Sequence, residues 1–254
     1  MKKKVLIITL LLTLWSALAV SMASAEPVDP IPNIGIQIGG DTGTGGGTSS
    51  LSLILLITVL SIAPAILVLM TSFTRIVIVL GFVRSSLGTA TSPPNQVLIG
   101  LALFLTLFVM SPTLSTINEV ALQPYIKGEI TQTEALNKAA VPMKKFMYSH
   151  TRPKDLQLFM SYTKTEKPKS YEEIPITVMV PAFAISELKT AFQMGFMIFI
   201  PFLIIDIVVS SVLMAMGMMM LPPVMISLPF KILLFVLVDG WYLIVKSLLV
   251  SFST

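Results

Sequence analysis

Four hydrophobic runs, arranged in two pairs, dominate the pattern of apolar and polar positions along the chain. These runs cover residues 51–83, 97–110, 192–221 and 224–252. A helix needs about 20 apolar residues to cross a bilayer core. Proline favours a break between helices, and Pro222 and Pro223 stand between the last two runs. The pattern therefore predicts two hydrophobic helical hairpins, over residues 51–117 and 189–254.

The runs are not uniform, because proline and charged residues interrupt them. Pro64, Pro201 and Pro229 lie inside runs, where each predicts a bend. Arg75 lies within the first run, beyond the part that alone would span a bilayer. The last two runs are each longer than a single crossing requires. We therefore expect long, kinked helices rather than four simple spans.

The stretch between the hairpins, residues 118–188, contains most of the charged residues of the chain. Their signs are mixed, which indicates a solvated domain rather than a patch of one charge. Thr131 and Glu134 have the spacing of a capping box at the start of a helix. Pro153 predicts a second helix start. The apolar face expected for that second helix consists of Leu156, Leu158, Phe159 and Tyr162.

The N-terminal residues have the pattern of an export signal. Lys2 to Lys4 precede an apolar stretch over residues 5–20, and Ala23 to Ala25 fit a small-residue cleavage site. We interpret residues 1–25 as a cleaved signal peptide, with an uncleaved anchor as the alternative. Residues 26–50 have the composition of a flexible Gly/Pro-rich linker. A cleaved signal would place the mature N-terminus outside, and if the first hairpin crosses the membrane twice, residues 118–188 also lie outside the cytoplasm.

The amino-acid composition is typical of a membrane protein. Apolar residues make up 54% of the chain and charged residues 12%, with a mean hydropathy of +0.88. The predicted fold is an all-α membrane-associated protein in which two long kinked helical hairpins flank a small helical extracytoplasmic domain. Most of the net charge of +4 comes from the lysines of the signal peptide. The charge therefore does not indicate nucleic acid binding.

The sequence does not indicate an enzyme. The sequence has no cysteine and one histidine, His150, which we expect to be a packing or surface residue. No spacing of metal ligands and no phosphate-binding glycine loop is present. We expect no metal, no cofactor and no catalytic residue.

Four ionisable residues lie in the last two apolar runs: Asp206, Lys231, Asp239 and Lys246. Charges in such runs face a partner or a water-filled path. If Pro222 and Pro223 mark a symmetric turn, Asp206 is level with Asp239 and about 12 Å from the level of Lys231. We therefore hypothesise a salt bridge between Asp206 and Lys231 of neighbouring subunits in a stepped oligomer. Charge neutralisation within one chain and an aspartyl protease dyad are the alternatives.

Two blocks are specific enough to indicate a family: PAFAISELKTAFQMGF (residues 181–196) and SLPFKILLFVLVDGW (residues 227–241). They resemble the FliP/SctR family of type III secretion export-gate proteins. The signal peptide and the Pro222-Pro223 pair resemble the flagellar branch. The resemblance covers residues 51–254.

The resemblance implies a pore-forming core subunit of the flagellar export gate in the inner membrane and basal body. Such a subunit forms a homopentamer, assembles with FliQ, FliR and other export-apparatus membrane proteins, and passes unfolded flagellar subunits. The alternatives are the equivalent subunit of a virulence-type injectisome and a small-molecule channel or transporter.

Met218, Met219 and Met220 stand between Gly217 and the two prolines of the predicted hairpin turn. Successive helical residues project about 100° apart, so one packed face cannot use all three side chains. Core filling is one interpretation. The other, which the resemblance supports, is a compliant methionine gasket that closes a pore and yields around a passing polypeptide.

Overall fold

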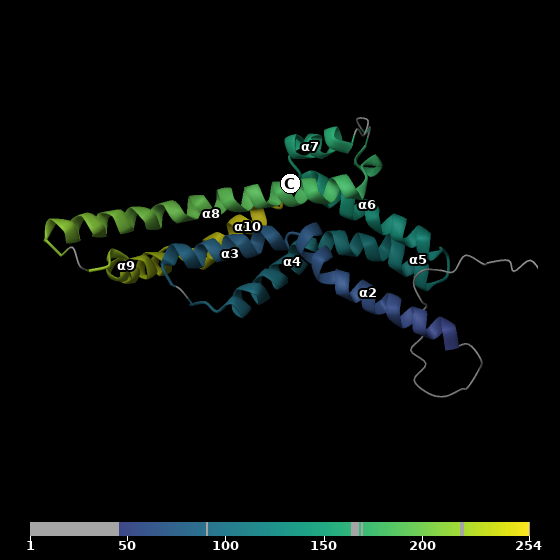
Figure 1. Ribbon diagram of the computed structural model, residues 1–254, viewed down its shortest axis with the longest axis horizontal. Helices are drawn as coiled ribbons and strands as arrows, with labels where there is room; N and C mark the ends of the chain where they lie inside the picture. The colour runs from purple at the N-terminus through teal and green to yellow at the C-terminus, as the bar shows by residue number, and fades with distance from the viewer. Residues whose placement is uncertain (1–45, 90, 164–167, 169, 219–220, 254) are drawn as a thin grey trace, which may run out of the picture. The chain divides into compact units, whose positions relative to one another are not determined.

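The structure, a computed structural model, describes residues 46–89, 91–163, 168, 170–218 and 221–253, and in these residues it contains helices and no strand (Figure 1). This confirms the all-α prediction. Residues 57–254 form one compact unit, which is the fold considered below. The helices are α2 (Gly46–Met70), α3 (Phe73–Leu87), α4 (Asn95–Ile117), η1 (Asn118–Leu122), α5 (Gln123–Ile126), α6 (Gln132–His150), α7 (Pro153–Thr163), η2 (Tyr171–Glu173), α8 (Ile176–Ala215), α9 (Pro223–Leu237) and α10 (Gly240–Val250).

The predicted signal peptide and most of the predicted linker lie outside the described residues. The end of the linker is placed differently, because α2 begins at Gly46 rather than at residue 51. Extending an existing helix costs less than starting one, since each added residue contributes a hydrogen bond without a new nucleus. A helix can therefore continue outward into residues of low helical propensity.

The first hydrophobic run bends by 68° between α2 and α3. We expected the bend at Pro64, but Pro64 lies inside α2 and the break falls at Thr71 and Ser72. The Thr71 hydroxyl donates to the Leu67 carbonyl and accepts from the Phe73 amide at 3.3 Å. A polar side chain thus satisfies backbone groups on both sides of the break, which proline cannot do.

The second apolar segment is longer than predicted, because α4, η1 and α5 form one helical segment of 32 residues, Asn95–Ile126. The segment passes through a π-helical turn, in which the Gln123 amide donates to the Asn118 carbonyl. Pro124 directly follows and lacks a backbone donor, so a regular α-helix would be disrupted there. The wider turn lets the chain pass Pro124 without ending the helix.

The predicted helix starts of the polar stretch are confirmed. Thr131 caps α6, and its hydroxyl oxygen accepts a hydrogen bond from the Glu134 amide at 3.3 Å. Helix α7 begins at Pro153. Its predicted apolar face is wrong in part, since Leu158 and Tyr162 are exposed. The hydrogen bonds of Asp155, described below, turn the Asp155 side of α7 towards α8 instead.

Helix α8 is continuous over 40 residues and passes through Pro181 and Pro201. It begins inside the stretch assigned to the polar domain, so the boundary drawn between residues 188 and 189 falls within one helix. Helices α3 and α9 run beside it (Figure 1). The same helix therefore belongs to both the polar region and the apolar region.

The fourth hydrophobic run is broken into α9 and α10, which are bent by 63°. We expected a bend at Pro229, but this residue lies inside α9. The break is at Asp239, where φ is 51°. A Cβ atom on the next residue, Gly240, would lie 2.3 Å from the Phe235 ring. Only glycine allows this close approach, and it fixes the place where α10 begins.

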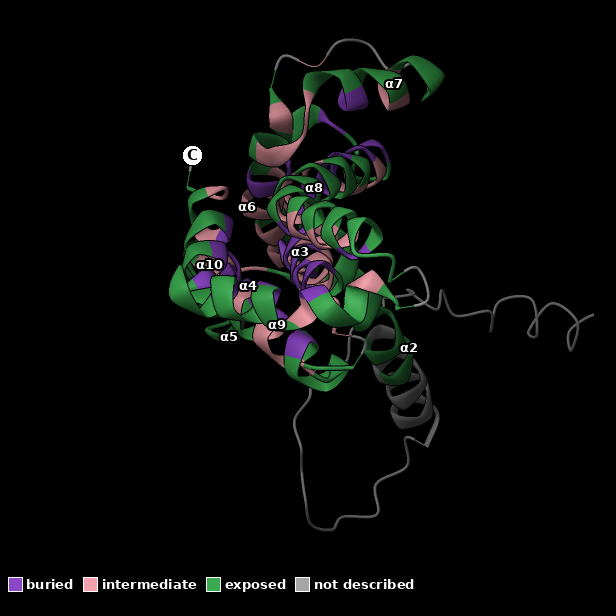
Figure 2. Cartoon of the chain, turned by 90° about the vertical axis from the view of Figure 1, so that its left-hand side faces the viewer, coloured by how far each residue is buried: buried purple, intermediate pink, exposed green. Residues whose placement is uncertain are grey.

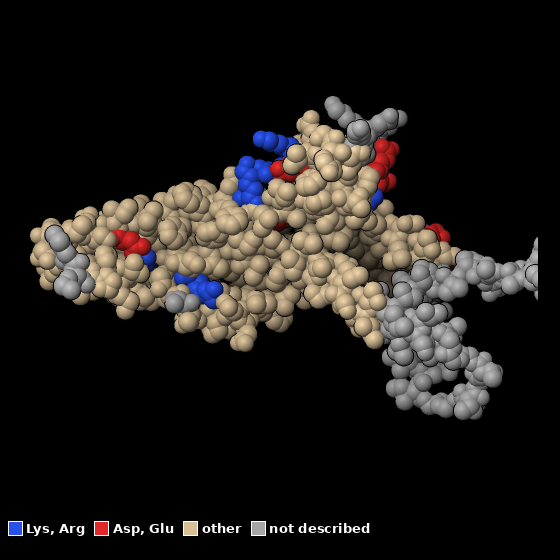
Figure 3. Space-filling view, in the orientation of Figure 1, with Lys and Arg blue, Asp and Glu red and all other residues tan. Residues whose placement is uncertain are grey.

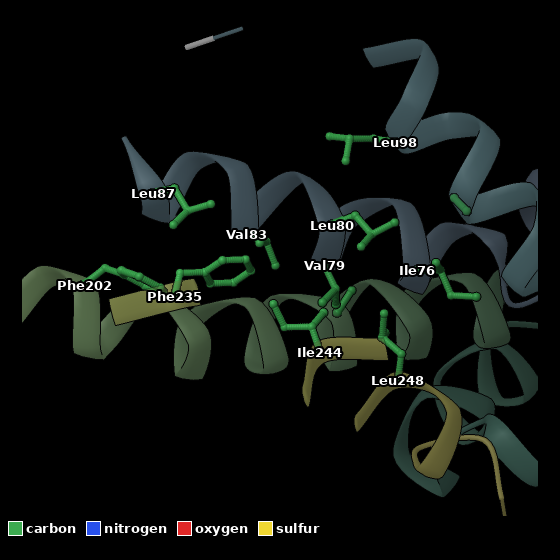
Figure 4. Packing of buried hydrophobic residues seen from close by; sticks show 12 residues of the cluster. Ile76, Val79, Leu80, Val83, Leu87, Leu98, Phe202, Phe235, Ile244 and Leu248 are labelled. Carbon is green, nitrogen blue, oxygen red and sulfur yellow. The ribbon is translucent and has the colours of Figure 1, made fainter. Parts of the chain in front are cut away.

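Two clusters of buried residues hold the fold together. The first joins α3 to α4, α8, α9 and α10, with Val79 and Leu80 at its centre (Figure 4). The second joins α4, α6, α7 and α8, and includes Phe146, Met179 and Phe183. Most residues on the outer sides of α8, α9 and α10 are exposed (Figure 2).

Two of the described helical segments, Asn95–Ile126 and Ile176–Ala215, are long and apolar enough to cross a membrane. The number rises to four if each of the two bent pairs counts as one span.

Candidate functional site

The connection between α8 and α9 forms the tip of the second hydrophobic pair. Helix α8 ends in a Schellman motif: the Gly217 amide donates to the Met214 carbonyl and the Met218 amide to the Leu213 carbonyl, both at 3.0 Å. Gly217 has a φ of 76°, which glycine adopts without steric cost. Of the three residues predicted to form the turn, Gly217 thus ends α8, and Pro222 and Pro223 begin α9.

The methionine triplet lies in this connection. Met218 is 41% exposed, and Met219 and Met220 lie outside the described residues. Met214 and Met225, which flank the connection on α8 and α9, are also exposed. In the single chain, the described methionines at the tip are therefore not core filling.

Asp206 and Lys231 form an ion pair within one chain, at 2.6 Å between Lys231 Nζ and Asp206 Oδ2. The other carboxylate oxygen, Oδ1, accepts a hydrogen bond from the Ser227 hydroxyl at 2.5 Å. Lys231 and Ser227 are buried, whereas the Asp206 side chain remains 22% exposed. The site is thus a buried cation with a partly exposed counter-ion.

This pair corrects the geometric argument made from the sequence, which placed the two residues too far apart within one hairpin. The turn is not centred on Pro222 and Pro223, because α8 already ends at Ala215. Asp206 lies nine residues before Ala215, and Lys231 lies eight residues after Pro223. The two are therefore nearly level, within about 2 Å along the helices. The reason given for pairing between subunits no longer applies.

Lys231 also faces the end of a third helix. Its Nζ lies 3.8 Å from the point where a Cβ atom on Gly88 would be. Gly88 caps the C-terminus of α3, where the helix dipole carries partial negative charge. The ammonium group thus lies between the Asp206 carboxylate of α8 and the carboxyl end of α3, and it links three helices.

Asp239 and Lys246, which we expected to be buried charges beside Lys231, are exposed. The expectation assumed one straight helix over the fourth run, and the break at Asp239 removes the shared face. Asp206 bonds to Ser227 and Lys231, and Asp239 lies at the break between α9 and α10. An aspartyl dyad is therefore not supported.

Arg75 is buried and forms the centre of a second polar cluster. Two of its nitrogens bond to the Glu187 carboxylate of α8, with Nε to Oε2 at 2.8 Å and Nη2 to Oε1. Nη1 donates to the carbonyl and the hydroxyl of Ser251, each at 3.0 Å. The guanidinium carbon lies 3.9 Å from the centroid of the Phe252 ring. Such a fork-to-fork pair is strong and directional.

Sequence reasoning missed Glu187 as a buried partner, because it was counted among the solvated charges of residues 118–188. Its side chain is 0% exposed. One signal was available: Glu187 lies in the apolar segment of residues 181–188, where it is the only acidic residue. A buried arginine elsewhere in the chain requires such a partner.

A third cluster ties α7 to α8. The Ser186 hydroxyl donates to Asp155 Oδ2 at 2.6 Å and accepts from the Arg152 amide at 3.0 Å. Arg152 Nη2 lies 2.6 Å from the same carboxylate oxygen. Burial alone would raise the pKa of Asp155, but these hydrogen bonds and the charges of Arg152 and Lys189 outweigh it and hold the pKa below its ordinary value. Asp155 therefore stays ionised at neutral pH.

Charged side chains are unevenly distributed on the surface. In the face shown in Figure 3, they gather over α6 and α7, while most of the surface over α8 and α9 is uncharged. Among the described residues, no group of three or more His, Cys, Asp or Glu side chains could hold a metal ion.

Helices of this length and apolar character, with charges buried in pairs and a turn at the tip, define a membrane-associated all-α protein. A family model described as the FliP family matches residues 56–248, and the chain belongs to the FliP family. This family is part of the flagellar export apparatus and is not enzymatic.

Three relatives share much of the sequence, and each is named flagellar biosynthetic protein FliP. The protein of Bacillus subtilis (strain 168) is 72% identical over 81% of this chain and 93% of its own length. The protein of Aquifex aeolicus (strain VF5) is 48% identical over 93% of this chain and 99% of its own length. The protein of Pectobacterium carotovorum subsp. carotovorum is 54% identical over 81% and 80%, respectively. The apolar helices and the family together mark a membrane protein of the flagellar apparatus.

Proposed function

We propose that this chain is a pore-forming core subunit of the flagellar type III export gate and passes unfolded flagellar subunits across the inner membrane. It would act as a homopentamer together with FliQ, FliR and other membrane proteins of the apparatus. Residues 118–188 would lie on the periplasmic side. Membership of the FliP family and the names of the relatives support the flagellar role.

The uncovered apolar surface of α8 is the observation that carries the proposal. Exposed apolar side chains run along its whole length, from Ile176 to Met214. A helix of 40 residues is about 60 Å long, whereas the hydrocarbon core of a bilayer is about 30 Å thick. Lipid alone cannot cover such a surface. We infer that protein neighbours cover much of the rest, as in a ring of subunits.

The proposal is tested by purifying the tagged chain from its own membrane and measuring export in the same strain. FliQ and FliR are expected to co-purify in one complex with about five copies of this chain, and deletion of the gene is expected to abolish flagellin export. The ion permeability of the membrane should not change on deletion. A monomer without these partners, or normal export after deletion, would contradict the proposal.

The methionine gasket gives a second prediction. Replacing Met218, Met219 and Met220 together by alanine is expected to leave assembly intact and to increase ion leak through the gate, because alanine is too short to close an irregular gap. Leak is measured as the loss of membrane potential in cells that produce the complex. Replacing exposed Met197 on α8 by alanine provides a matched control. Equal leak in the two variants would exclude the gasket.

A further inference from the structure

The residues that follow α10 dock into the fold through two side chains of different kinds. Ser251 accepts hydrogen bonds from Arg75 of α3. The Phe252 ring lies against the Arg75 guanidinium on one side and contacts the His150 ring of α6, with 5.3 Å between ring centroids. One aromatic ring is therefore shared by a permanent cation and a titratable group.

His150 is held in place by its own helix. Its Nδ1 lies 2.8 Å from the Phe146 carbonyl and 3.0 Å from the Ser149 hydroxyl. The imidazole also packs against the Phe146 ring, at 4.7 Å between centroids, and Phe146 stacks with Phe252 at 6.4 Å. The imidazole is thus part of an aromatic group that receives the end of α10.

The charges around His150 disfavour a proton on its ring. Arg75 of α3 is the charged group that acts on it, and the negative charge of Glu187 on α8 is already bound to Arg75 by two hydrogen bonds. On the α7 side, Arg152 is paired with Asp155. The residues after α10 contribute Ser251 and Phe252, which carry no side-chain charge. A second cation at His150 would face Arg75 across Phe252, and within the part of the chain that the structure describes no acidic side chain acts on His150 to offset it.

We propose that Ser251 and Phe252 form a pH-sensitive clamp, which docks the end of α10 on α3 and α6 while His150 is neutral and releases it when His150 is protonated. The clamp goes beyond the export role proposed above, since it concerns how the last turn of the fold is held. It would let the pH on the side of α6 and α7 alter the position of α10, and with it α9 and the tip.

The direction of the pH effect follows from the burial of the imidazole. Burial lowers the pKa of His150 below its ordinary value of 6.5, and Arg75 acts in the same direction, while the backbone carbonyl groups of Phe146 and Phe252 act in the opposite one. Release lets the imidazole bind a proton more readily. The contribution of neutral His150 to docking is therefore fully present above pH 6.5 and is lost as the pH falls from 6.5 through the lowered pKa.

The absence of cysteine makes the test direct, because a single introduced cysteine gives a unique label. We would attach a nitroxide spin label to Ser253→Cys in the full-length chain and record its mobility by electron paramagnetic resonance from pH 8 to pH 5. The immobilised component is expected to be lost as the pH falls below 6.5. A label at Ser211→Cys, exposed on α8, should show no such change.

Variants of His150 separate the clamp from general acid unfolding. His150→Gln, which stays neutral, should keep the Ser253→Cys label immobile throughout, and His150→Lys should leave it mobile throughout. Phe252→Leu removes the shared ring and should leave the label mobile at every pH. The proposal is overturned if the His150→Gln chain shows the same pH profile as the parent, or if the label is never immobilised. If His150→Gln does not fold, His150→Asn serves in its place.

Discussion

Replacing Arg75 by alanine is expected to lower the free energy of unfolding by about 3–5 kcal/mol, the range measured when one partner of a buried ion pair is removed. The change leaves Glu187, whose side chain is 0% exposed, without its two charge-assisted hydrogen bonds. It also removes the donors to Ser251 and the cation on Phe252. The loss can be measured by urea denaturation of the detergent-solubilised chain.

A double replacement distinguishes two contributions to the loss of stability: the burial of an unpaired charge and the loss of the interaction between Arg75 and Glu187. Arg75→Met together with Glu187→Leu is expected to recover much of the lost stability, because apolar residues of similar size often replace a buried pair without loss. The exposed pair Glu134–Lys138 on α6 provides the control, and Glu134→Ala should change stability by at most about 0.5 kcal/mol. If Arg75→Ala and Glu134→Ala lowered the free energy of unfolding equally, the importance of burial for the Arg75–Glu187 pair would be contradicted.

The Asp206–Lys231 pair between α8 and α9 is expected to respond unequally to the loss of each partner. Asp206→Ala leaves the ammonium group of Lys231 buried without a counter-ion, and we expect a loss of about 3 kcal/mol. Lys231→Met leaves an aspartate whose side chain is 22% exposed and still accepts from Ser227. Water can hydrate that carboxylate, so a smaller loss of about 1 kcal/mol is expected.

Both effects can be read from the same denaturation experiment. The order of the two variants is the informative result, because a pair that is equally buried on both sides would give equal losses. A larger loss for Lys231→Met than for Asp206→Ala would contradict the arrangement described here. Ser227→Ala, which removes only the hydroxyl bonded to Asp206, serves as the matched control and should cost about 1 kcal/mol.

The helical architecture could be predicted from the sequence because apolar runs and capping residues are local signals. Thr131 and Pro153 start helices where their chemistry indicates, and Gly217 ends α8. The breaks inside the runs could not be predicted from proline. Pro64, Pro201 and Pro229 all lie within helices, while the sharp bends depend on Thr71 and on the contact between Gly240 and Phe235. The contact between Gly240 and Phe235 spans only five positions, but the sequence alone does not show that the backbone turns there.

For the same reason, the charged residues of the candidate site could be predicted from the sequence, but their partners could not. Asp206, Lys231 and Arg75 could be selected because charges in apolar runs are rare. Their partners could not be assigned from the sequence. Glu187 is 112 positions away from Arg75, and the level of Lys231 with Asp206 depends on where α8 ends. A displacement of one helix end by a few residues was enough to change the expected partner.

The continuity of α8 has a mechanical consequence. One end of this helix is held by α6 and α7, and the other carries the tip connection at Gly217. A helix about 60 Å long that tilts by about 10° at its held end moves its far end by roughly 10 Å. Because α3 and α9 pack beside α8, such a tilt would carry both helices with it, and the displacement would be larger at the methionine end than in the charged region.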